Sequence, residues 1–249
     1  MKPFLFVTDL DDTLLGDDFA LQKLNKQLEE HRQRYQTKIV YTTRRSFFSY
    51  QIIAQAKSLL KPDALITSLG TQMYFDPEQA KCDREWSDIL AQGWHREQIL
   101  AIANKFPQLQ PQPQSEQNPF KISYYLSHPI AETIINQLKI FLAEAGFEIK
   151  FFYHADQDLD LFPPNADQGL AVKFLQSKWQ LATLRTVTCG DSISDIDLLS
   201  GEENGIIVGN AKPELRQWYQ ENQRPSLYQA REASAGGILE GLQYFTFLI

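Results

Sequence analysis

The sequence is short of cysteine and has no long apolar run. Its 249 residues include two cysteines, Cys82 and Cys189, which lie far apart and predict no disulfide scaffold. No apolar stretch approaches the roughly 20 residues of a membrane-spanning helix, and no signal-peptide pattern precedes the first apolar run. These features predict a reduced, soluble cytoplasmic protein with no membrane segment.

Clusters of positive charge are also missing. Lysine and arginine number 24 against 31 aspartates and glutamates, which gives a net charge of −7 and an isoelectric point near 5.2. Nucleic-acid binding needs clustered cations that meet the phosphates, and the densest basic spots here are pairs such as Arg44 and Arg45. We therefore expect no nucleic-acid partner. A phosphorylated small molecule is compatible with the acidic charge, because a bound divalent cation can reverse the local potential.

The N-terminal third of the chain alternates between strand and helix patterns. Apolar runs at residues 4–7, 38–42 and 64–67 predict strands, and the segments between them have the apolar spacing of helices. The first helix is expected to follow a cap at Asp17 or Asp18. This β-α-β-α-β order indicates a parallel sheet with right-handed crossovers.

Several large apolar side chains lie on expected helices, and we predict that they face the core. The second helix is expected over residues 46–60, and another helical stretch contains Trp86 and Trp94. The apolar residues of the second helix are Phe47, Phe48, Tyr50, Ile52 and Ile53.

The pattern changes after about residue 78. Residues 107–119 are rich in proline and glutamine and predict an extended connector. A strand, a helix and two further strands follow, and the last two must be antiparallel because only a short polar turn joins them. We therefore expect an α/β protein with a Rossmann-like parallel-sheet core, residues 1–78 and 164–249, and an inserted α+β domain, residues 79–163.

Two aspartates follow the first expected strand directly. Asp9 and Asp11 lie where the chain leaves the sheet, which is where open α/β folds bind their ligands. Residues i and i+2 of an extended backbone point to the same side, so the two carboxylates repel each other and need a cation or a shared proton. The plain alternative is a polar strand end or a helix cap.

Four segments in order resemble the motifs of the haloacid dehalogenase (HAD) superfamily of phosphohydrolases. Residues 8–14 contain Asp-x-Asp-x-Thr-Leu, which is similar to the first motif. Thr43, at the end of the second expected strand, resembles the second motif. Residues 190–195 read Gly-Asp-x-x-x-Asp, like the fourth motif, and residues 205–211 match the strand and Asn-Ala turn that follow it.

A narrower resemblance is to the sucrose-phosphatases of that superfamily. Residues 116–124 are similar to their cap segment, and residues 63–71 and 235–240 also resemble this group. The similarity to the cyanobacterial members covers nearly the whole chain. It implies a C2-type cap, a substrate-specificity domain, at residues 79–163, and hydrolysis of sucrose 6-phosphate within carbohydrate metabolism.

The resemblance also implies a mechanism and a metal. Asp9 would attack phosphorus, and Asp11 would protonate the departing sugar oxygen and later activate water. Mg²⁺ would be held by Asp9, the backbone carbonyl of Asp11 and Asp191, with Asp195 orienting these ligands. Oxygen-only ligands suit Mg²⁺ better than Zn²⁺.

Three residues are expected at the phosphate, and two of them depart from the family pattern. Thr43 would bind phosphate oxygens through its hydroxyl. Arg44 replaces the glycine of the second motif, where it either crowds the phosphate loop or adds a phosphate contact. Gln168 stands where the third-motif lysine is expected, and a neutral amide donates a hydrogen bond but cannot neutralise charge.

The substrate and the extent of activity stay open at this point. The expected sugar contacts are Lys121, Ser123 and Tyr124, with a cap strand bearing outward polar residues as the alternative. The main hypothesis is a Mg²⁺-dependent sucrose-6-phosphate phosphatase. One alternative is a catalytically impaired homologue that binds a sugar phosphate or a partner such as sucrose-phosphate synthase. Another is a phosphatase for a different sugar phosphate.

Overall fold

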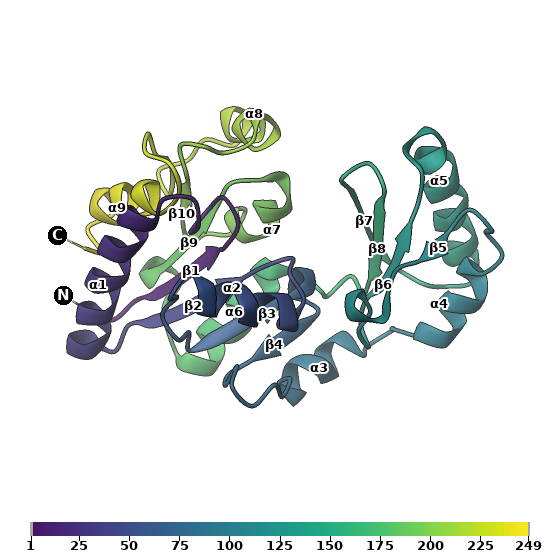
Figure 1. Ribbon diagram of the computed structural model, residues 1–249, viewed down its shortest axis with the longest axis horizontal. Coiled ribbons are helices and arrows are strands. Elements are labelled where there is room, and N and C mark those ends of the chain that lie inside the picture. The colour runs from purple at the N-terminus through teal and green to yellow at the C-terminus, as the bar shows by residue number, and fades with distance from the viewer. Residues whose placement is uncertain (1, 249) are drawn as a thin grey trace. The chain divides into compact units, whose positions relative to one another are not determined.

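The computed structural model describes residues 2–248, and the chain folds as two compact units (Figure 1). One unit, here called the core unit, contains the residues up to Lys81 and those from Asp167 onward. The other, the insert unit, is Cys82–Ala166. It begins and ends three residues later than the expected range of 79–163, because both boundaries lie in loops that carry no strand or helix pattern.

Within residues 2–248, seven strands form the sheet of the core unit, in the order β11-β10-β9-β1-β2-β3-β4. Neighbouring strands are parallel except for β4, which is antiparallel to β3 at the edge. The parallel sheet expected from the sequence is confirmed. The strands are β1 (Leu5–Asp9), β2 (Lys38–Thr42), β3 (Ala64–Thr67), β4 (Gln72–Tyr74), β9 (Thr186–Gly190), β10 (Asn204–Ile207) and β11 (Leu227–Gln229).

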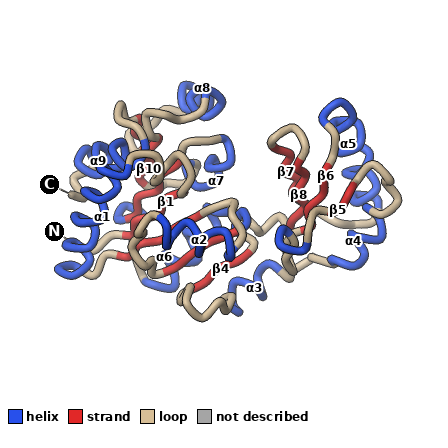
Figure 2. Tube along the Cα trace, in the orientation of Figure 1, coloured by secondary structure: helices blue, strands red, loops and turns tan. Residues whose placement is uncertain are grey.

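Helices flank this sheet, as the tube view in Figure 2 shows. Every residue of β1 and β9 is buried, which is the usual state of parallel strands covered on both faces. The helices of the core unit are α1 (Asp18–Tyr35), α2 (Phe47–Ala56), α6 (Gln168–Trp179), α7 (Ile196–Leu199), α8 (Pro213–Glu221) and α9 (Ser234–Tyr244), with short 3₁₀ turns at η1 (Ser68–Gly70), η3 (Thr183–Arg185) and η4 (Ile193–Asp195).

Local sequence explains where the first two helices begin. Asp17 caps α1, because its carboxylate accepts hydrogen bonds from the N–H groups of Phe19 and Ala20. Ser46 caps α2 in the same way, but α2 ends at Ala56, four residues before the expected end at residue 60. The structure resolves the choice between the two candidate caps of α1 in favour of Asp17.

The prediction that the apolar side chains of α2 all face the core is wrong. Tyr50 is buried, whereas Phe48 is 69% exposed and Ile52 is 57% exposed. The helix carries no charged residue, so its sequence has no charged stripe that marks the solvent face. Trp86 and Trp94 are buried as expected.

Residues 82–166 form a four-stranded antiparallel sheet, in the order β5-β6-β8-β7, with helices packed against it. The antiparallel pairing of the last two strands is confirmed. Part of the expected connector, residues 107–119, is an edge strand of this sheet. The elements are α3 (Arg84–Leu90), α4 (Arg96–Ala103), β5 (Gln110–Pro111), η2 (Gln114–Glu116), β6 (Ile122–Tyr125), α5 (His128–Glu144), β7 (Lys150–His154) and β8 (Asp158–Phe162).

Among residues 2–248, no helix combines the length and the apolar character that crossing a bilayer requires. Cys189, in β9, is a buried free thiol. Burial raises the pKa of the Cys189 thiol well above its ordinary value, so this group is an unreactive part of the core.

Candidate active site

Three buried carboxylates meet at the carboxyl ends of β1 and β9. These strands pair in parallel, with Thr8 opposite Cys189, so Asp9 and Asp191 come to the same edge of the sheet. One carboxylate oxygen from each of Asp9, Asp191 and Asp195 lies within 4.8 Å of the others. We call these three residues the acidic cluster. The sequence predicted all three as functional residues, and the structure brings them together.

The turn after β9 fixes the position of Asp195. Its Oδ2 atom accepts hydrogen bonds from the backbone N–H groups of Asp191 at 3.0 Å and Ser192 at 2.9 Å, and from the Ser192 hydroxyl at 3.1 Å. A Cβ atom at Gly190 would lie 2.5 Å from the Asp195 Cβ atom, so only glycine fits there. The spacing of the fourth motif therefore has a direct steric reason.

Thr13 ties the first motif to the fourth. Its hydroxyl donates a hydrogen bond of 2.9 Å to Asp191 Oδ1, although the two residues are 178 positions apart. Both side chains are buried. No role for Thr13 was predicted from the sequence. Its place in the Asp-x-Asp-x-Thr pattern is the signal that could have indicated one.

Burial and mutual repulsion raise the pKa values of the acidic cluster. Desolvation, followed by the charges of Asp195 and Asp191, holds the pKa of Asp9 well above its ordinary value. Desolvation is also the largest cause of the raised pKa of Asp191, and it raises the pKa of Asp195 to about 6. Three carboxylates in this state favour a cation between them, and their oxygen-only donors fit a hard divalent ion such as Mg²⁺.

Asp11 lies outside the acidic cluster and is paired with Arg45. The guanidinium contacts both carboxylate oxygens, at 2.7 Å from Nη2 and 2.8 Å from Nε, and its Nη1 atom donates to the Ser49 hydroxyl at 3.0 Å. The Asp11 side chain is 44% exposed, so it remains accessible to a ligand. No role for Arg45 was predicted from the sequence, because this contact joins residues 34 positions apart.

Thr43 and Arg44 follow β2 directly. The register places Thr42 opposite Asp9, so both residues lie at the edge of the sheet that carries the acidic cluster. Thr43 is buried, and its hydroxyl oxygen accepts a hydrogen bond of 3.1 Å from the Arg45 N–H. Arg44 is exposed, and its side chain makes no hydrogen bond or ion pair with any residue that the structure describes.

A loop with an uncommon backbone supports these residues from the side of β3. Ser68 and Leu69 both have positive φ values, of 52° and 61°, although neither is glycine. The Ser68 N–H donates to the Arg45 carbonyl at 3.1 Å, and the Leu69 N–H donates to the Thr43 carbonyl at 3.4 Å. The shape of the loop after β2 therefore depends on a strained neighbour.

Gln168, the residue at the expected position of the third-motif lysine, is the first residue of α6. The Asp167 side chain caps this helix by accepting from the Leu170 N–H. Gln168 is 3% exposed, and its Oε1 atom has no hydrogen-bond partner among residues 2–248. A buried polar atom without a partner is uncommon and marks a site that a ligand or water completes.

The turn after β10 adds a further cation near the first motif. The Lys212 ammonium contacts Asp12 Oδ2 at 2.7 Å, and its backbone N–H donates to the Asp191 carbonyl at 2.7 Å. The Asn210 amide donates to the Asp12 carbonyl at 2.7 Å. This Asn-Ala turn resembles the segment that follows the fourth HAD motif, but the sequence predicted no role for Lys212.

The insert unit contains a separate, buried polar group on the face of its sheet that points away from the apolar cluster of this unit. Lys121 and Asp160 are both buried, and their charged atoms lie 3.5 Å apart. Asp160 Oδ1 also accepts from the Ser123 hydroxyl at 2.5 Å, and His154 Nε2 lies 3.6 Å from Asp160 Oδ2. The sequence predicted Lys121 and Ser123 but missed Asp160 and His154.

Tyr124 does not belong to this polar group. Side chains alternate along β6, and Tyr124 lies in the apolar cluster between the sheet and the helices of the insert unit. It is 1% exposed, and burial raises the pKa of its hydroxyl to about 12. The expectation that Tyr124 contacts sugar therefore does not fit this structure, because the residue faces the core.

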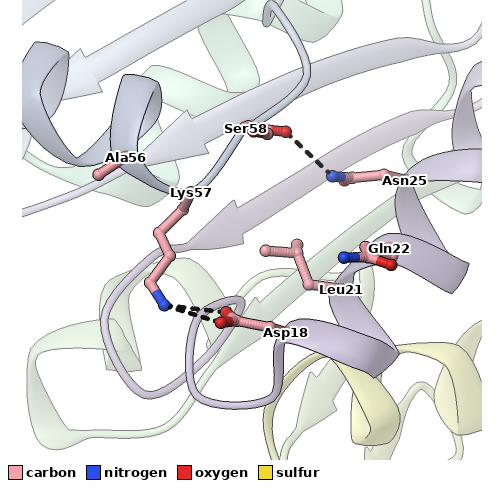
Figure 3. Close-up of a pocket in the computed structure, with 7 residues that line it drawn as sticks. All are labelled: Asp18, Leu21, Gln22, Asn25, Ala56, Lys57 and Ser58. Atoms are coloured by element: carbon pink, nitrogen blue, oxygen red, sulfur yellow. Dashed lines mark hydrogen bonds and ion pairs between the residues drawn. The ribbon is translucent and has the colours of Figure 1, made fainter.

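A small hollow between α1 and α2 offers none of this chemistry (Figure 3). Its volume is about 190 Å³, and an ion pair between Lys57 and Asp18, at 2.9 Å, crosses it. The Asn25 amide donates to the Ser58 carbonyl at 3.5 Å on the other side. These contacts join the end of α2 to α1 and are structural.

Comparisons with known proteins cover nearly the whole chain. The sequence profile of the sucrose-6F-phosphate phosphohydrolase family matches residues 2–246. Probable sucrose-phosphatase 2 of Arabidopsis thaliana is 32% identical over 97% of this chain, and the chain spans 59% of that protein's length. The mannosylfructose-phosphate phosphatase of Agrobacterium fabrum is 25% identical, with 98% of each chain covered.

Solved structures agree with the sequence comparison. The sucrose-phosphatase of Synechocystis sp. PCC6803, solved in complex with sucrose and phosphate, superimposes with a TM-score of 0.86 at 35% identity and full coverage of both chains. A haloacid dehalogenase-like hydrolase of Bacillus subtilis, at 18% identity and a TM-score of 0.74, shares the fold. The expected HAD fold is confirmed, and the chain belongs to the sucrose-6F-phosphate phosphohydrolase family.

Proposed function

We propose that this chain is a Mg²⁺-dependent phosphatase that hydrolyses sucrose 6-phosphate to sucrose and phosphate. The observation that carries the proposal is the acidic cluster at the ends of β1 and β9, with the accessible carboxylate of Asp11 beside it. Support comes from membership of the family and from the likeness to a sucrose-phosphatase that binds sucrose and phosphate. The low cysteine content, two residues in 249, fits a cytoplasmic location.

Asp9 acts as the nucleophile in this proposal. A carboxylate oxygen of Asp9 forms a bond to phosphorus while the bond from phosphorus to the sugar oxygen breaks, which leaves an aspartyl-phosphate. Asp11 gives a proton to the departing oxygen. It then takes a proton from the water that attacks phosphorus, which releases phosphate and frees Asp9.

The acidic cluster and the Asp11 carbonyl are the residues that would hold Mg²⁺. When bound, the ion supplies positive charge at the transferring phosphoryl oxygens and offsets repulsion between that group and Asp9. In this proposal Thr43 donates its hydroxyl proton to a phosphate oxygen, while its hydroxyl oxygen accepts from the Arg45 N–H. Proton transfer by Asp11 requires that at least one contact of its pair with Arg45 opens.

The insert unit supplies sugar recognition in this proposal. Lys121 and Ser123 contact sugar hydroxyls, and Asp160 and His154 extend the set of donors and acceptors. Fixed, buried polar groups discriminate strongly between substrates, because a substrate lacking the matching hydroxyl leaves them unpaired. The close Ser123–Asp160 and Lys121–Asp160 contacts hold the group in place.

A phosphate-release assay tests the proposal. Purified protein is offered a panel of sugar phosphates with Mg²⁺ and, in parallel, with a chelator. We expect release from sucrose 6-phosphate with Mg²⁺ only. Equal release from simple hexose phosphates would contradict the specificity, and release in the chelator would contradict the metal requirement.

Two alternatives each have one supporting observation. Another disaccharide phosphate is favoured by the similarity to a mannosylfructose-phosphate phosphatase, and the panel therefore includes mannosylfructose phosphate. A catalytically impaired homologue that binds a sugar phosphate or sucrose-phosphate synthase is favoured by Gln168 in the third motif. That alternative predicts ligand or synthase binding without phosphate release.

A further inference from the structure

Negative charge exceeds positive charge around the acidic cluster, because the nearest cations are paired with other carboxylates. Asp11 and Asp12 add two more carboxylates around it, and each is already paired, with Arg45 and Lys212 respectively. A phosphorylated substrate would bring further negative charge to the same edge of the sheet. Besides the Mg²⁺ proposed for the acidic cluster, a cationic side chain without an anionic partner would therefore favour binding of this ligand.

The helix side of the site does not supply that cation. Gln168 is neutral, buried and placed at the start of α6, where the third motif would carry a lysine. Its unpartnered Oε1 atom is an acceptor, which neither neutralises nor binds an anionic oxygen.

Arg44 is the unpaired cation on the other side. Its guanidinium makes no hydrogen bond or ion pair with the described residues, in contrast to the neighbouring Arg45. The parallel pairing of Thr42 with Asp9 places Arg44 at the edge of the sheet where the nucleophile lies.

We propose that Arg44 binds the phosphoryl group and supplies the positive charge that Gln168 cannot. The inference rests on the proposed phosphatase function and names the residue that completes its site. A guanidinium binds two phosphate oxygens at once and stays charged at all relevant pH values. Arg44 therefore contacts the substrate from the loop after β2, whereas a third-motif lysine would do so from the start of α6.

A set of four variants tests this exchange of roles, with Arg34→Gln as the matched control. Arg34 is an exposed arginine in the last turn of α1, and its replacement makes the same change in net charge. Arg44→Gln should lower kcat by roughly 10²-fold, the size of effect expected when a charge aimed at the transition state is lost. Arg44→Lys should recover part of the loss. Gln168→Lys should raise kcat in the Arg44→Gln background far more than in the wild type.

Binding of inorganic phosphate with Mg²⁺, measured by calorimetry, gives a readout that does not depend on turnover. Arg44→Gln should weaken phosphate binding by about tenfold, and Arg34→Gln should not change it. If wild type binds phosphate through Arg44 but releases none from any sugar phosphate, the proposed function fails while the role of Arg44 stands. If Arg44→Gln matches Arg34→Gln in both assays, the inference is wrong. A loss that Gln168→Lys does not repair would refute the exchange of roles.

Discussion

The buried pair of Lys121 and Asp160 gives the sharpest test of how the insert unit works. The side chains are 7% and 5% exposed, so neither charge is well solvated. Replacing Lys121 with Met keeps the packing of the stem but leaves Asp160 as a buried charge without its cation. Breaking such a pair from one side typically costs about 3–5 kcal/mol. His154 and Ser123 still contact Asp160, so we expect the lower end of this range.

The pH dependence of this loss follows from the carboxylate. Burial alone would raise the pKa of Asp160, but the contact with His154, the charge of Lys121 and the Ser123 hydroxyl together hold it below its ordinary value. Asp160 thus stabilises the wild type above the carboxyl pKa range, and this contribution is lost as the pH falls through it. Without Lys121 the pKa of Asp160 rises. The difference in unfolding free energy between wild type and variant should therefore shrink on acidification.

The experiment separates stability from recognition. Urea unfolding is followed by tryptophan fluorescence, since Trp86 and Trp94 lie in the insert unit. The double variant Lys121→Met/Asp160→Asn removes the unpaired charge and should recover most of the stability. KM for sucrose 6-phosphate should stay raised in both variants, with KM for p-nitrophenyl phosphate nearly unchanged. The reasoning is refuted if KM recovers with stability, or if KM rises equally for the two substrates.

Three further predictions concern the acidic cluster. Asp9→Asn should abolish phosphate release with the melting temperature preserved, and wild-type rates would remove Asp9 from the mechanism. Raised carboxyl pKa values, about 6 for Asp195, favour the metal-free fold at low pH, and this contribution is lost as the pH rises through that value. Adding Mg²⁺ should therefore raise the melting temperature more at about pH 7.5 than at about pH 5 in scanning calorimetry, and equal shifts would contradict a site in this cluster. Gly190→Ala should cost about 1–3 kcal/mol and weaken Mg²⁺ binding in a titration, because the added methyl group meets Asp195; unchanged Mg²⁺ affinity would show that Asp195 is not a positioned ligand.

Much of the core unit could be predicted from the sequence because its central strands are largely buried. The apolar runs at residues 5–7 and 39–41 lie in these strands, and each is followed by polar side chains, so the sequence pattern indicates both the strand and its end. Asp9 and Asp191 follow such strands, and the parallel order of the sheet brings them together. The faces of α2 could not be predicted in this way, because nothing in its composition separates Phe48 from Tyr50.

The remaining contacts depend on register, which sequence spacing does not show. Asp160 lies opposite Ser123 only because β6 and β8 pair with that alignment, and a shift by one residue would turn Asp160 towards the helices. The pair of Arg45 and Asp11 likewise joins two loops that meet through the pairing of their strands. No local sequence pattern indicates the contacts that these residues make.

At Leu69 the backbone conformation makes replacement by glycine or asparagine less costly than replacement by another branched apolar residue. The residue is buried but left-handed, with φ 61° and ψ 35°, so its side chain suits the core while its backbone suits glycine or asparagine. Isoleucine matches leucine in size and polarity, yet β-branching makes this conformation especially costly. Over evolutionary time we expect position 69 to change more readily to glycine or asparagine than to valine or isoleucine. Here backbone handedness, more than hydrophobicity, would limit which residues can replace Leu69 beside the loop after β2.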